Sequence, residues 1–390
     1  MRKDKILLLY ADATQTLPVA RSLHKKGFFL AGVFASRRSY GYPSRFISKR
    51  FLFADVENSQ AYYQFVRQIL EREKYVAVIP MNDDAAVMLS KYSTELRQFT
   101  AFVMPDYKTF SRAYDKHSLM QLCQEKGYPH PRTTIVEDGH IEQIDADSLQ
   151  FPLLIKPNLT CGARGMTYCE DKNELLGKFP SIYREYGDCH LQSFVPVGGH
   201  QVEVQLYINE KQKLIQSSVI KKFRWYPENG GSSCCNTSDE NDKIVGICCQ
   251  ILKDIGWVGF ADFDTIEDPR TGELLIMEIN PRLPACVKTP FAAGIDWADI
   301  IVSEYLGNPH KFYQSGKNIY LRHLGFEILW FFYSKNRFKT TPNWFKFLGR
   351  NIFYQDISCF SDPLPFFFGT LGNVIKQLSP KFRKTKSGTR

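Results

Sequence analysis

Residues 260–284 read FADFDTIEDPRTGELLIMEINPRLP, which predicts two strands joined by a turn. Apolar and acidic residues alternate in FADFD, so Asp262 and Asp264 should project from one face of the first strand. The residues DPRTG have the composition of a turn, and LLIMEIN forms a nearly continuous apolar strand. Folding the turn back brings Asp264 close to Glu278 and Asn280, which share a face. The stretch therefore predicts a hairpin with oxygen-bearing side chains at one end.

Asp264, Glu278 and Asn280 offer three hard oxygen ligands, and Arg282 follows two residues later. This set suits Mg²⁺ that bridges nucleotide phosphates. A solvated edge hairpin is the simpler alternative, and the DPRTG turn alone fits it. Glu278, however, sits between LLIM and Ile279, and an acid in so apolar a strand usually has a partner or a metal. We therefore predict a metal site at Asp264, Glu278 and Asn280.

Length and composition are those of a globular protein with several packed units. The chain has 390 residues, of which 44% are hydrophobic and 23% charged. It lacks a run of about 18 apolar residues, so no membrane-spanning helix is expected. The ten cysteines form no CxxC pairs, which argues against zinc and favours a reduced, cytoplasmic protein.

Residues 1–110 alternate strand and helix signals. The run KILLLYA predicts a buried strand, TLPVARSLHKKG a helix that ends at glycine, and FFLAGVFAS a second strand. The helix SQAYYQFVRQILEREK then leads into a strand that begins YVAVIP. This rhythm predicts a small parallel-sheet domain. Asn82, Asp83 and Asp84 follow the last strand, where open α/β sheets bind ligands, although one of them could equally cap the next helix.

The pattern changes in residues 111–190. SRAYDKHSLMQLCQEKG predicts one helix, followed by the extended link YPHPRT. FPLLIKPNLTCGARGM then predicts a strand that ends at Lys156 and a loop that contains Gly162 and Gly165. Glycines let a backbone approach an anion closely, and Lys156 and Arg164 supply charge for phosphates. Neither GKS nor GKT follows, so this is not a Walker A loop.

Several separated signals occur in the order found in the ATP-grasp superfamily of carboxylate-activating ligases, which residues 1–310 resemble. Lys116 in YDKHSLM matches the first nucleotide-contacting lysine of that pattern, and Lys156 in PLLIKP matches the second. TCGARGM resembles the mobile glycine loop that closes over the triphosphate. EINPR resembles the end of the metal triad, with Arg282 as the phosphate-stabilising arginine. Within the superfamily the chain is similar to D-aspartate ligases and to the carbamoyl-phosphate synthase large chain.

The resemblance also implies how the nucleotide is held. LQSFVPVGG resembles the hinge whose backbone meets adenine. Gln201 or Glu203 is the implied partner of the ribose hydroxyls, and the sequence does not decide between them. The implied cofactors are ATP and two Mg²⁺ ions, with Mn²⁺ as an alternative metal. The implied nucleotide-binding residues are Lys116, Lys156, Gly162, Arg164, Gly165, Gln192, Ser193, Phe194, Val195, Gln201 and Glu203.

The implied reaction joins a carboxylate to an amine. The carboxylate takes the γ-phosphate of ATP while Mg²⁺, Lys156 and Arg282 neutralise charge, and the amine then displaces phosphate from the acyl-phosphate. Arg224 in KKFR, with Lys221 or Lys222, is a candidate to hold the substrate carboxylate, because a guanidinium binds one bidentately, and a solvated basic strand end is the alternative. Two other functions stay open: a carbamoyl-phosphate synthase-like enzyme that stops at phosphoryl transfer, and a nucleotide-binding module without catalysis.

Residues 311–390 do not resemble the family core. They hold 14 Lys/Arg and 3 Asp/Glu, whereas residues 1–310 hold 36 and 38, and 19 Phe, Trp and Tyr lie among them. Three interpretations stay open: aromatics that cover the ligase core, a peripheral membrane contact through 326–390, and contact with single-stranded nucleic acid, which no RNA-binding motif supports. A contact with the inner face of the membrane would suit a cell-envelope role. Examples are the attachment of an amino acid to a surface polysaccharide or to a lipid-linked cell-wall precursor.

We therefore expect an α/β protein in three parts. A Rossmann-like pre-ATP-grasp domain spans 1–110, a two-subdomain ATP-grasp fold spans 111–310 with its small mobile subdomain at about 150–195, and an aromatic, basic extension spans 311–390. About 12 residues at the end are expected to be disordered. The expected partners are carboxylate and amine substrates, small or carried on a glycan or peptide. A homodimer is compatible with the sequence, and nothing favours nucleic acid.

Overall fold

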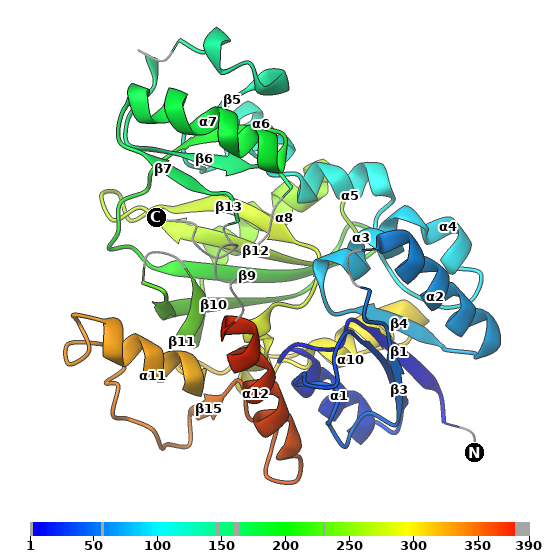
Figure 1. The fold of residues 1–390 in the computed structure, drawn as a ribbon. Coiled ribbons are helices and arrows are strands. Elements are labelled where there is room, and N and C mark those ends of the chain that lie inside the picture. Colours follow the sequence, from blue (N-terminus) through cyan, green and yellow to red (C-terminus); the bar gives the residue numbers. More distant parts are fainter. Residues whose placement is uncertain (1–2, 56–57, 146–147, 160–163, 229–230, 379–390) are drawn as a thin grey trace.

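The protein is built from parallel and antiparallel sheets with helices packed against them (Figure 1). The computed structural model describes residues 3–55, 58–145, 148–159, 164–228 and 231–378. Its parallel N-terminal sheet is followed by two antiparallel sheets, so the predicted α/β class is confirmed.

The N-terminal sheet is parallel and has the order β3-β2-β1-β4. Its elements are β1 (Lys5–Leu9), α1 (Thr16–Lys25), β2 (Phe29–Phe34), β3 (Lys49–Leu52), α2 (Ser59–Arg72), β4 (Ala77–Pro80), α3 (Asp83–Lys91) and α4 (Ser93–Leu96). The predicted parallel sheet is confirmed. The edge strand β3 was not predicted, because its four residues, KRFL, are two basic side chains followed by two apolar ones and show no strand periodicity over so short a span.

A small antiparallel sheet, β5-β8-β6-β7, lies at the top of Figure 1 beneath α7. Buried side chains of its strands and of α7 form a separate core, which includes Ile155, Leu191 and Phe179. The chain reaches this sheet through two consecutive helices. The elements are α5 (Tyr107–Tyr114), α6 (Lys116–Lys126), β5 (Thr133–Ile135), the 3₁₀ turns Glu137–Gly139 and Ile141–Gln143, β6 (Leu153–Pro157), β7 (Thr167–Cys169), α7 (Lys172–Tyr186) and β8 (Cys189–Ser193).

The single helix predicted over 111–127 is wrong, because the structure has the two helices α5 and α6 there. Asp115 adopts extended backbone angles between them, and its side chain accepts a hydrogen bond from the backbone N–H of Ser118. This is the bonding of a helix N-cap, which satisfies a backbone donor at the start of α6. The break makes Lys116 the first residue of α6.

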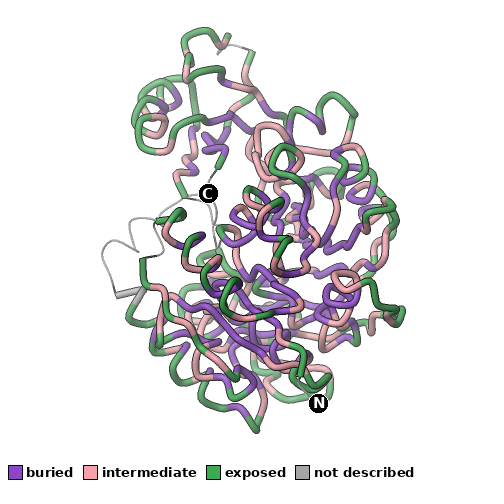
Figure 2. Tube along the Cα trace, turned by 90° about the vertical axis from the view of Figure 1, so that its right-hand side faces the viewer, coloured by how far each residue is buried: buried purple, intermediate pink, exposed green. Residues whose placement is uncertain are grey.

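The large sheet has the order β13-β12-β9-β10-β11-β14-β15, and only the pair β14–β15 is parallel among its neighbouring strands in the described residues. Its core is continuous with that of the N-terminal domain, since Trp297 packs edge-on against Phe260 in a cluster that includes Ile6 of β1. Figure 2 shows this buried interior in purple. The elements are β9 (Gln201–Ile208), β10 (Leu214–Tyr226), β11 (Ser232–Asp239), α8 (Asp242–Ile255), β12 (Gly259–Glu267), β13 (Leu274–Asn280), the 3₁₀ turn Ala285–Val287, α9 (Lys288–Ala293) and α10 (Trp297–Leu306).

The extension packs on both of these units. It contributes β14 (Tyr320–Arg322), α11 (Leu324–Tyr333), β15 (Ile352–Tyr354) and α12 (Leu364–Leu378). Strand β14 pairs with β11, and α11 packs against β10 and β11. On the other side, the Asp362 carboxylate accepts hydrogen bonds from the Ser44 hydroxyl and the Arg45 N–H of the N-terminal domain. These elements of the extension therefore pack on the core, whereas several of its aromatic side chains, among them Phe332 and Phe338, stay exposed, so the interpretation in which the aromatics cover the core holds only in part.

No helix in the described residues is both long enough and apolar enough to cross a bilayer.

A buried ion cluster fixes the extension to the large sheet. Arg224 of β10 and Arg322 of β14 both donate to Oε1 of Glu327 in α11, at 2.7 and 3.2 Å, and the three side chains are at most 1% exposed. The remaining donors of the two guanidinium groups bind the loop after α11, at the Thr340 hydroxyl and the carbonyls of Pro342, Trp344 and Lys346.

We expect Glu327→Gln to lower the free energy of unfolding by about 3 to 5 kcal/mol, because it leaves two buried guanidinium groups without a counter-charge. Urea unfolding monitored by circular dichroism measures the loss. Glu240→Gln is the matched control, since Glu240 pairs with Lys317 on the surface and its loss should change stability little. Equal effects of the two substitutions would contradict a structural role for the cluster.

Candidate nucleotide and metal site

The β12–β13 hairpin brings the predicted metal ligands together. Asp264 lies opposite Glu278 and Asp262 opposite Asn280 in the strand register. The Asn280 Nδ2 donates to Asp264 Oδ2 at 3.2 Å. Asp264 and Glu278 keep 31% and 27% of their side chains exposed, so a ligand can reach them. The expected proximity of these side chains is confirmed, and their role as metal ligands stays a prediction.

Cations from three other places in the chain surround these acids. The Lys222 Nζ on β10 lies 3.1 Å from Asp264 Oδ1 and 2.5 Å from Glu203 Oε1 on β9. Lys116, at the start of α6, pairs with Glu278 at 3.1 Å. Burial disfavours the charge of Lys222, but Asp264 and Glu203 outweigh it and hold the pKa of Lys222 well above its usual value. Lys222, which the sequence offered beside Arg224 as a candidate for the substrate carboxylate, is therefore a charged member of this cluster.

Arg282 connects the acidic cluster to Asp83 of the N-terminal domain. Its guanidinium donates to Asn280 Oδ1 at 3.2 Å and lies 3.3 Å from an oxygen of Asp83. Asn82 caps α3 by accepting from the Ala85 N–H, so the capping alternative is confirmed for Asn82. Asp83 instead holds the arginine that the sequence links to phosphate.

The chemistry of this cluster fits a divalent cation. Asp262 is 1% exposed, and its Oδ1 has no hydrogen-bond partner among the described residues. Burial, together with the neighbouring Glu203 and Asp264, raises the pKa of Asp262 well above its usual range. A divalent cation beside these carboxylates would relieve that repulsion, and carboxylate and amide oxygens are its preferred ligands. Asp264, Glu278 and Asn280 are thus suited to hold Mg²⁺, with Asp262 next to them.

The small sheet contributes a second group of polar side chains. The Lys156 Nζ donates to Gln192 Oε1 at 2.9 Å, and both side chains are buried. His190 lies opposite Lys156 in the register, and its Nδ1 donates to Asn158 Oδ1 at 2.8 Å. The His190 Nε2 has no hydrogen-bond partner among the described residues. Burial, Lys156 and Lys116 lower the pKa of His190, so the ring is neutral and Nε2 is a free acceptor. In the sequence His190 is an isolated histidine in a predicted strand, and nothing in that pattern indicates a functional residue.

The hinge residues lie where β8 leaves the small sheet. Ser193 ends β8, and the Phe194 N–H donates to the Pro152 carbonyl. Val195 follows them in an irregular segment. Their predicted contact with adenine stays a prediction.

Gln201 and Glu203 are the two candidates for the ribose contact. Glu203 is buried, pairs with Lys222 and accepts from the thiol of Cys286. Gln201 is half-buried, at the first residue of β9. Glu203 is thus already engaged with the acidic cluster, which favours Gln201 for the ribose and leaves that contact a prediction.

The predicted phosphate loop is described only in part, since Gly162 lies outside the described residues. Gly165 has φ +69°, and a Cβ there would lie 2.8 Å from atoms of Pro157 and Tyr186, so the position requires glycine. Arg164 is exposed and near Asp84, whose pKa is raised by burial and by Asp83 and lowered by Arg164. The loop arginine therefore lies close to the acidic residues that follow β4.

Arg224 lies apart from the cluster described above. It is 2% exposed and bonded to the extension, and a Trp330 ring lies 5.2 Å from its guanidinium. The alternative of a solvated basic strand end is wrong, because Lys222 and Arg224 are both buried. The observed contacts of Arg224 are structural, and its predicted contact with a substrate carboxylate remains untested.

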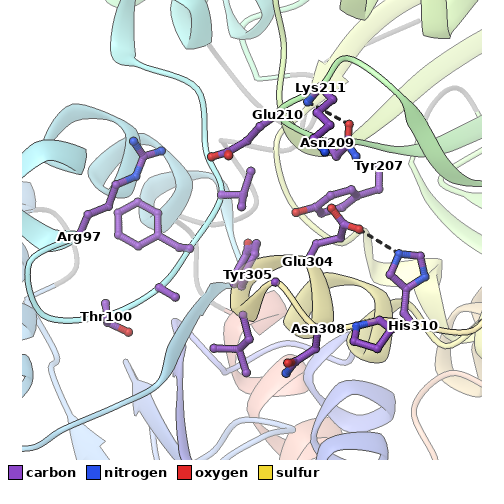
Figure 3. A pocket seen from close by; sticks show the side chains of 16 residues that line it. Arg97, Thr100, Tyr207, Asn209, Glu210, Lys211, Glu304, Tyr305, Asn308 and His310 are labelled. Carbon is purple, nitrogen blue, oxygen red and sulfur yellow. Dashed lines mark hydrogen bonds and ion pairs between the residues drawn. The ribbon is translucent and has the colours of Figure 1, made fainter.

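A large hollow of about 1080 Å³ lies elsewhere, between residues 97–103, the β9–β10 turn and the end of α10 (Figure 3). Arg97, Asn209 and Lys211 line it together with Glu304, which contacts His310 at 2.9 Å. No predicted site residue that the structure describes lines this hollow. Its size therefore does not mark the candidate nucleotide site, whose acidic side chains lie on the large sheet and pair with Lys116 of α6.

Comparison with known proteins agrees with this geometry. Residues 113–286 match the family model of the ATP-grasp domain. Residues 113–286 therefore form an ATP-grasp domain, and the resemblance to the ATP-grasp superfamily is confirmed for this part of the chain.

Its curated relatives are distant. D-aspartate ligase of Enterococcus faecium is 27% identical over 234 residues, which cover 54% of this chain and 54% of that protein. A carbamoyl phosphate synthase large chain of Clostridium beijerinckii is 23% identical over 265 residues, covering 65% of this chain and 24% of that protein. The chain thus spans about half of the first relative and a quarter of the second.

Solved structures share the fold. The biotin carboxylase domain of Hydrogenobacter thermophilus 2-oxoglutarate carboxylase, solved with MgADP, gives a TM-score of 0.68 at 16% identity, covering 82% of this chain and 74% of that one. An L-amino acid ligase from Bacillus licheniformis gives 0.61 at 13% identity, covering 78% and 75%. At these identities the likeness concerns the fold alone.

We expect Glu278→Gln to weaken Mg²⁺-dependent ATP binding about tenfold or more, because it removes a charged oxygen from the ligand set. Isothermal titration calorimetry with MgATP measures the change in affinity. A parallel titration of ATP in the presence of EDTA measures how much of that affinity depends on Mg²⁺. Glu273→Gln is the control, since Glu273 is exposed in the turn of the same hairpin. The metal assignment would be wrong if both variants bound MgATP as the wild type does.

Proposed function

We propose that the protein is an ATP-dependent ligase that activates a carboxylate as an acyl-phosphate and joins it to an amine. The observation that carries this proposal is the arrangement of Asp264, Glu278 and Asn280 beside Arg282, with Lys116 reaching across from α6 to Glu278. This is the charge distribution that phosphoryl transfer from ATP requires, because negative oxygens must be positioned and neutralised.

Each group has a role in the proposed reaction. Bound Mg²⁺ would neutralise phosphate oxygens, and Asp264, Glu278 and Asn280 would hold it. Arg282 is oriented by Asp83 and Asn280, so its guanidinium is fixed where phosphate charge develops. Lys116 and Lys156 approach from the side of the small sheet and suit the other phosphates. The transfer needs no covalent protein nucleophile, because the carboxylate itself attacks the phosphorus.

The choice of amine follows from the curated relatives and the extension. D-aspartate ligase is named for joining an amino acid, so amino acids are the first amines to test. The basic, aromatic extension favours an acceptor in the cell envelope, such as a surface polysaccharide or a cell-wall precursor. For Arg224 to hold the substrate carboxylate, its ion pair with Glu327 would first have to break, so that the substrate carboxylate takes the place of the Glu327 side chain.

We expect phosphate release from MgATP to require one carboxylic acid and one amine together. Release measured against a matrix of amino acids and carboxylic acids, including uronic acids, identifies the pair. If the acid alone supported phosphate release, the protein would be an enzyme that stops at phosphoryl transfer and not a ligase. ATP binding without turnover on any pair, lipid-linked and polymeric acceptors included, would point to a module that only binds.

We expect Arg282→Gln to reduce kcat about 100-fold with a smaller change in KM, because a fixed donor to developing charge is lost. Steady-state kinetics on the identified pair measure this. Arg270→Gln is the matched control, since Arg270 lies exposed in the turn of the same hairpin and pairs only locally with Asp268. If Arg282→Gln raised KM and left kcat unchanged, Arg282 would contribute to substrate binding and not to stabilisation of the transition state.

A further inference from the structure

The described part of the extension presents only basic charge to solvent. Its three acidic residues are buried, with Glu327, Asp356 and Asp362 at 0%, 1% and 2% exposure. Each of them has a partner inside the protein: two arginines for Glu327, His323 at 3.7 Å for Asp356, and Ser44 for Asp362. No acidic residue lies between 328 and 355. Residues 328–355 therefore display their basic side chains outward with no acidic residue among them.

Aromatic side chains lie among these exposed basic residues. In and after α11, Phe332, Phe338 and Phe345 are 68%, 68% and 57% exposed. Their rings cluster around Phe331, which lies 6.1, 5.7 and 5.8 Å from them. We call this group the aromatic lobe. The basic residues that accompany it are exposed or half-buried, and they are Lys335, Arg337, Lys339, Lys346 and Arg350.

Helix α12 turns its apolar side outward. Gly369 and Gly372 face the N-terminal domain so closely that a Cβ would lie 2.2 Å from the Tyr40 ring and 2.0 Å from the Arg38 carbonyl oxygen. Only this glycine side fits against the domain, so the opposite side must face solvent. That side is an apolar stripe at helical spacing, whose members are 42% to 62% exposed: Leu364, Phe367, Phe368, Leu371, Val374 and Ile375.

These two surfaces account for an unusual share of exposed apolar side chains. Fourteen of the nineteen exposed large apolar residues in the described part of the chain lie within 311–378. In Figure 1 both α11 and α12 lie away from the small sheet, in the opposite half of the view. Large exposed apolar patches mark interaction sites, because single apolar residues are normally scattered over a surface.

We propose that the aromatic lobe and the stripe of α12 dock the protein on an anionic lipid surface. Aromatic rings and a helix lying flat in the interface remove apolar area from water, while lysines and arginines beside them pair with anionic headgroups. Charge complementarity selects this occupant, because residues 328–355 carry five basic side chains and no acid. Docking does not depend on the reaction at the ATP-grasp site.

Flotation with large unilamellar vesicles tests the proposal on the full chain. The wild-type protein is expected to float with vesicles of phosphatidylcholine and phosphatidylglycerol, and much less with phosphatidylcholine alone. Raising the salt to about 1 M should weaken binding, because the Debye length falls to about 3 Å. Failure of the wild type to bind anionic vesicles would overturn the proposal.

A charge-reversal triple variant tests the basic residues. Lys335→Glu, Lys339→Glu and Lys346→Glu together should lower the partition coefficient about 100-fold, since each basic residue near a membrane surface contributes about 1 kcal/mol. The matched control reverses three exposed lysines elsewhere, Lys211, Lys213 and Lys253, and should bind nearly as the wild type does. If both variants lost vesicle binding equally, binding would depend on the net charge of the protein, which would contradict docking through a defined surface.

A second triple variant tests the stripe of α12. Phe367→Gln, Leu371→Gln and Val374→Gln should reduce partitioning about tenfold or more and leave ATP turnover and the melting temperature unchanged, because these side chains are exposed. The control is Leu52→Gln with Leu176→Gln, two exposed leucines outside the extension.

Light scattering and single-stranded DNA binding, measured on the same proteins, test the two other possible occupants of this surface, a second copy of the chain and a nucleic acid. A dimer that the stripe variant dissociates, without vesicle binding by the wild type, would assign the surface to a second copy. Tight binding to single-stranded DNA in place of vesicles would assign it to nucleic acid.

Discussion

The concentration of carboxylates on neighbouring strands is the constraint on which the rest of the structure depends. Glu203 on β9, Asp262 and Asp264 on β12 and Glu278 on β13 lie in adjacent strands of one sheet. Buried carboxylates cannot remain charged side by side without counter-charges, and their isolation from water is costly. Lys222 from β10, Lys116 from α6 and Arg282 from the segment after β13 supply those charges. The cluster thus ties together the large sheet, the helix before the small sheet and, through Asp83, the N-terminal domain.

The same arrangement explains why the two sheets can be expected to move relative to one another. The small sheet has its own core, built from its strands and α7. Lys116, on the helix α6 that precedes the small sheet, forms an ion pair with Glu278 of the large sheet, while the apolar residues of α6 belong to the core of the large sheet. Ion pairs between exposed or half-exposed groups are weak and easily exchanged. A nucleotide with its metal would replace such pairs with stronger ones, so binding and closure of the small sheet would be coupled.

The sequence predicted those features that depend on neighbours in the chain. The β12–β13 hairpin followed from alternation and a turn composition, and the register then placed Asp264 against Glu278. The parallel N-terminal sheet followed from periodicity in the same way. The features that were missed depend on contacts distant in the chain: Lys222, a candidate for the substrate carboxylate, pairs with acids on other strands, and Arg224 is bound by Glu327, 103 residues away. The break between α5 and α6 was missed because apolar periodicity continues through Asp115, and only its capping bond marks the boundary.

The place of β14 in the large sheet bears on where the chain can be divided. A protein cut after residue 310 would lose the strand that pairs with β11, and the backbone groups of β11 would become an open sheet edge of the kind that recruits other chains. The same cut would leave Arg224 inside the protein without the carboxylate that neutralises it. The match to the ATP-grasp family ends at residue 286, yet the folding unit extends well beyond it. Expression boundaries chosen from the family match alone would therefore yield an aggregation-prone fragment, whereas boundaries that include β15 and α12 would keep the edge of β11 paired and Arg224 neutralised.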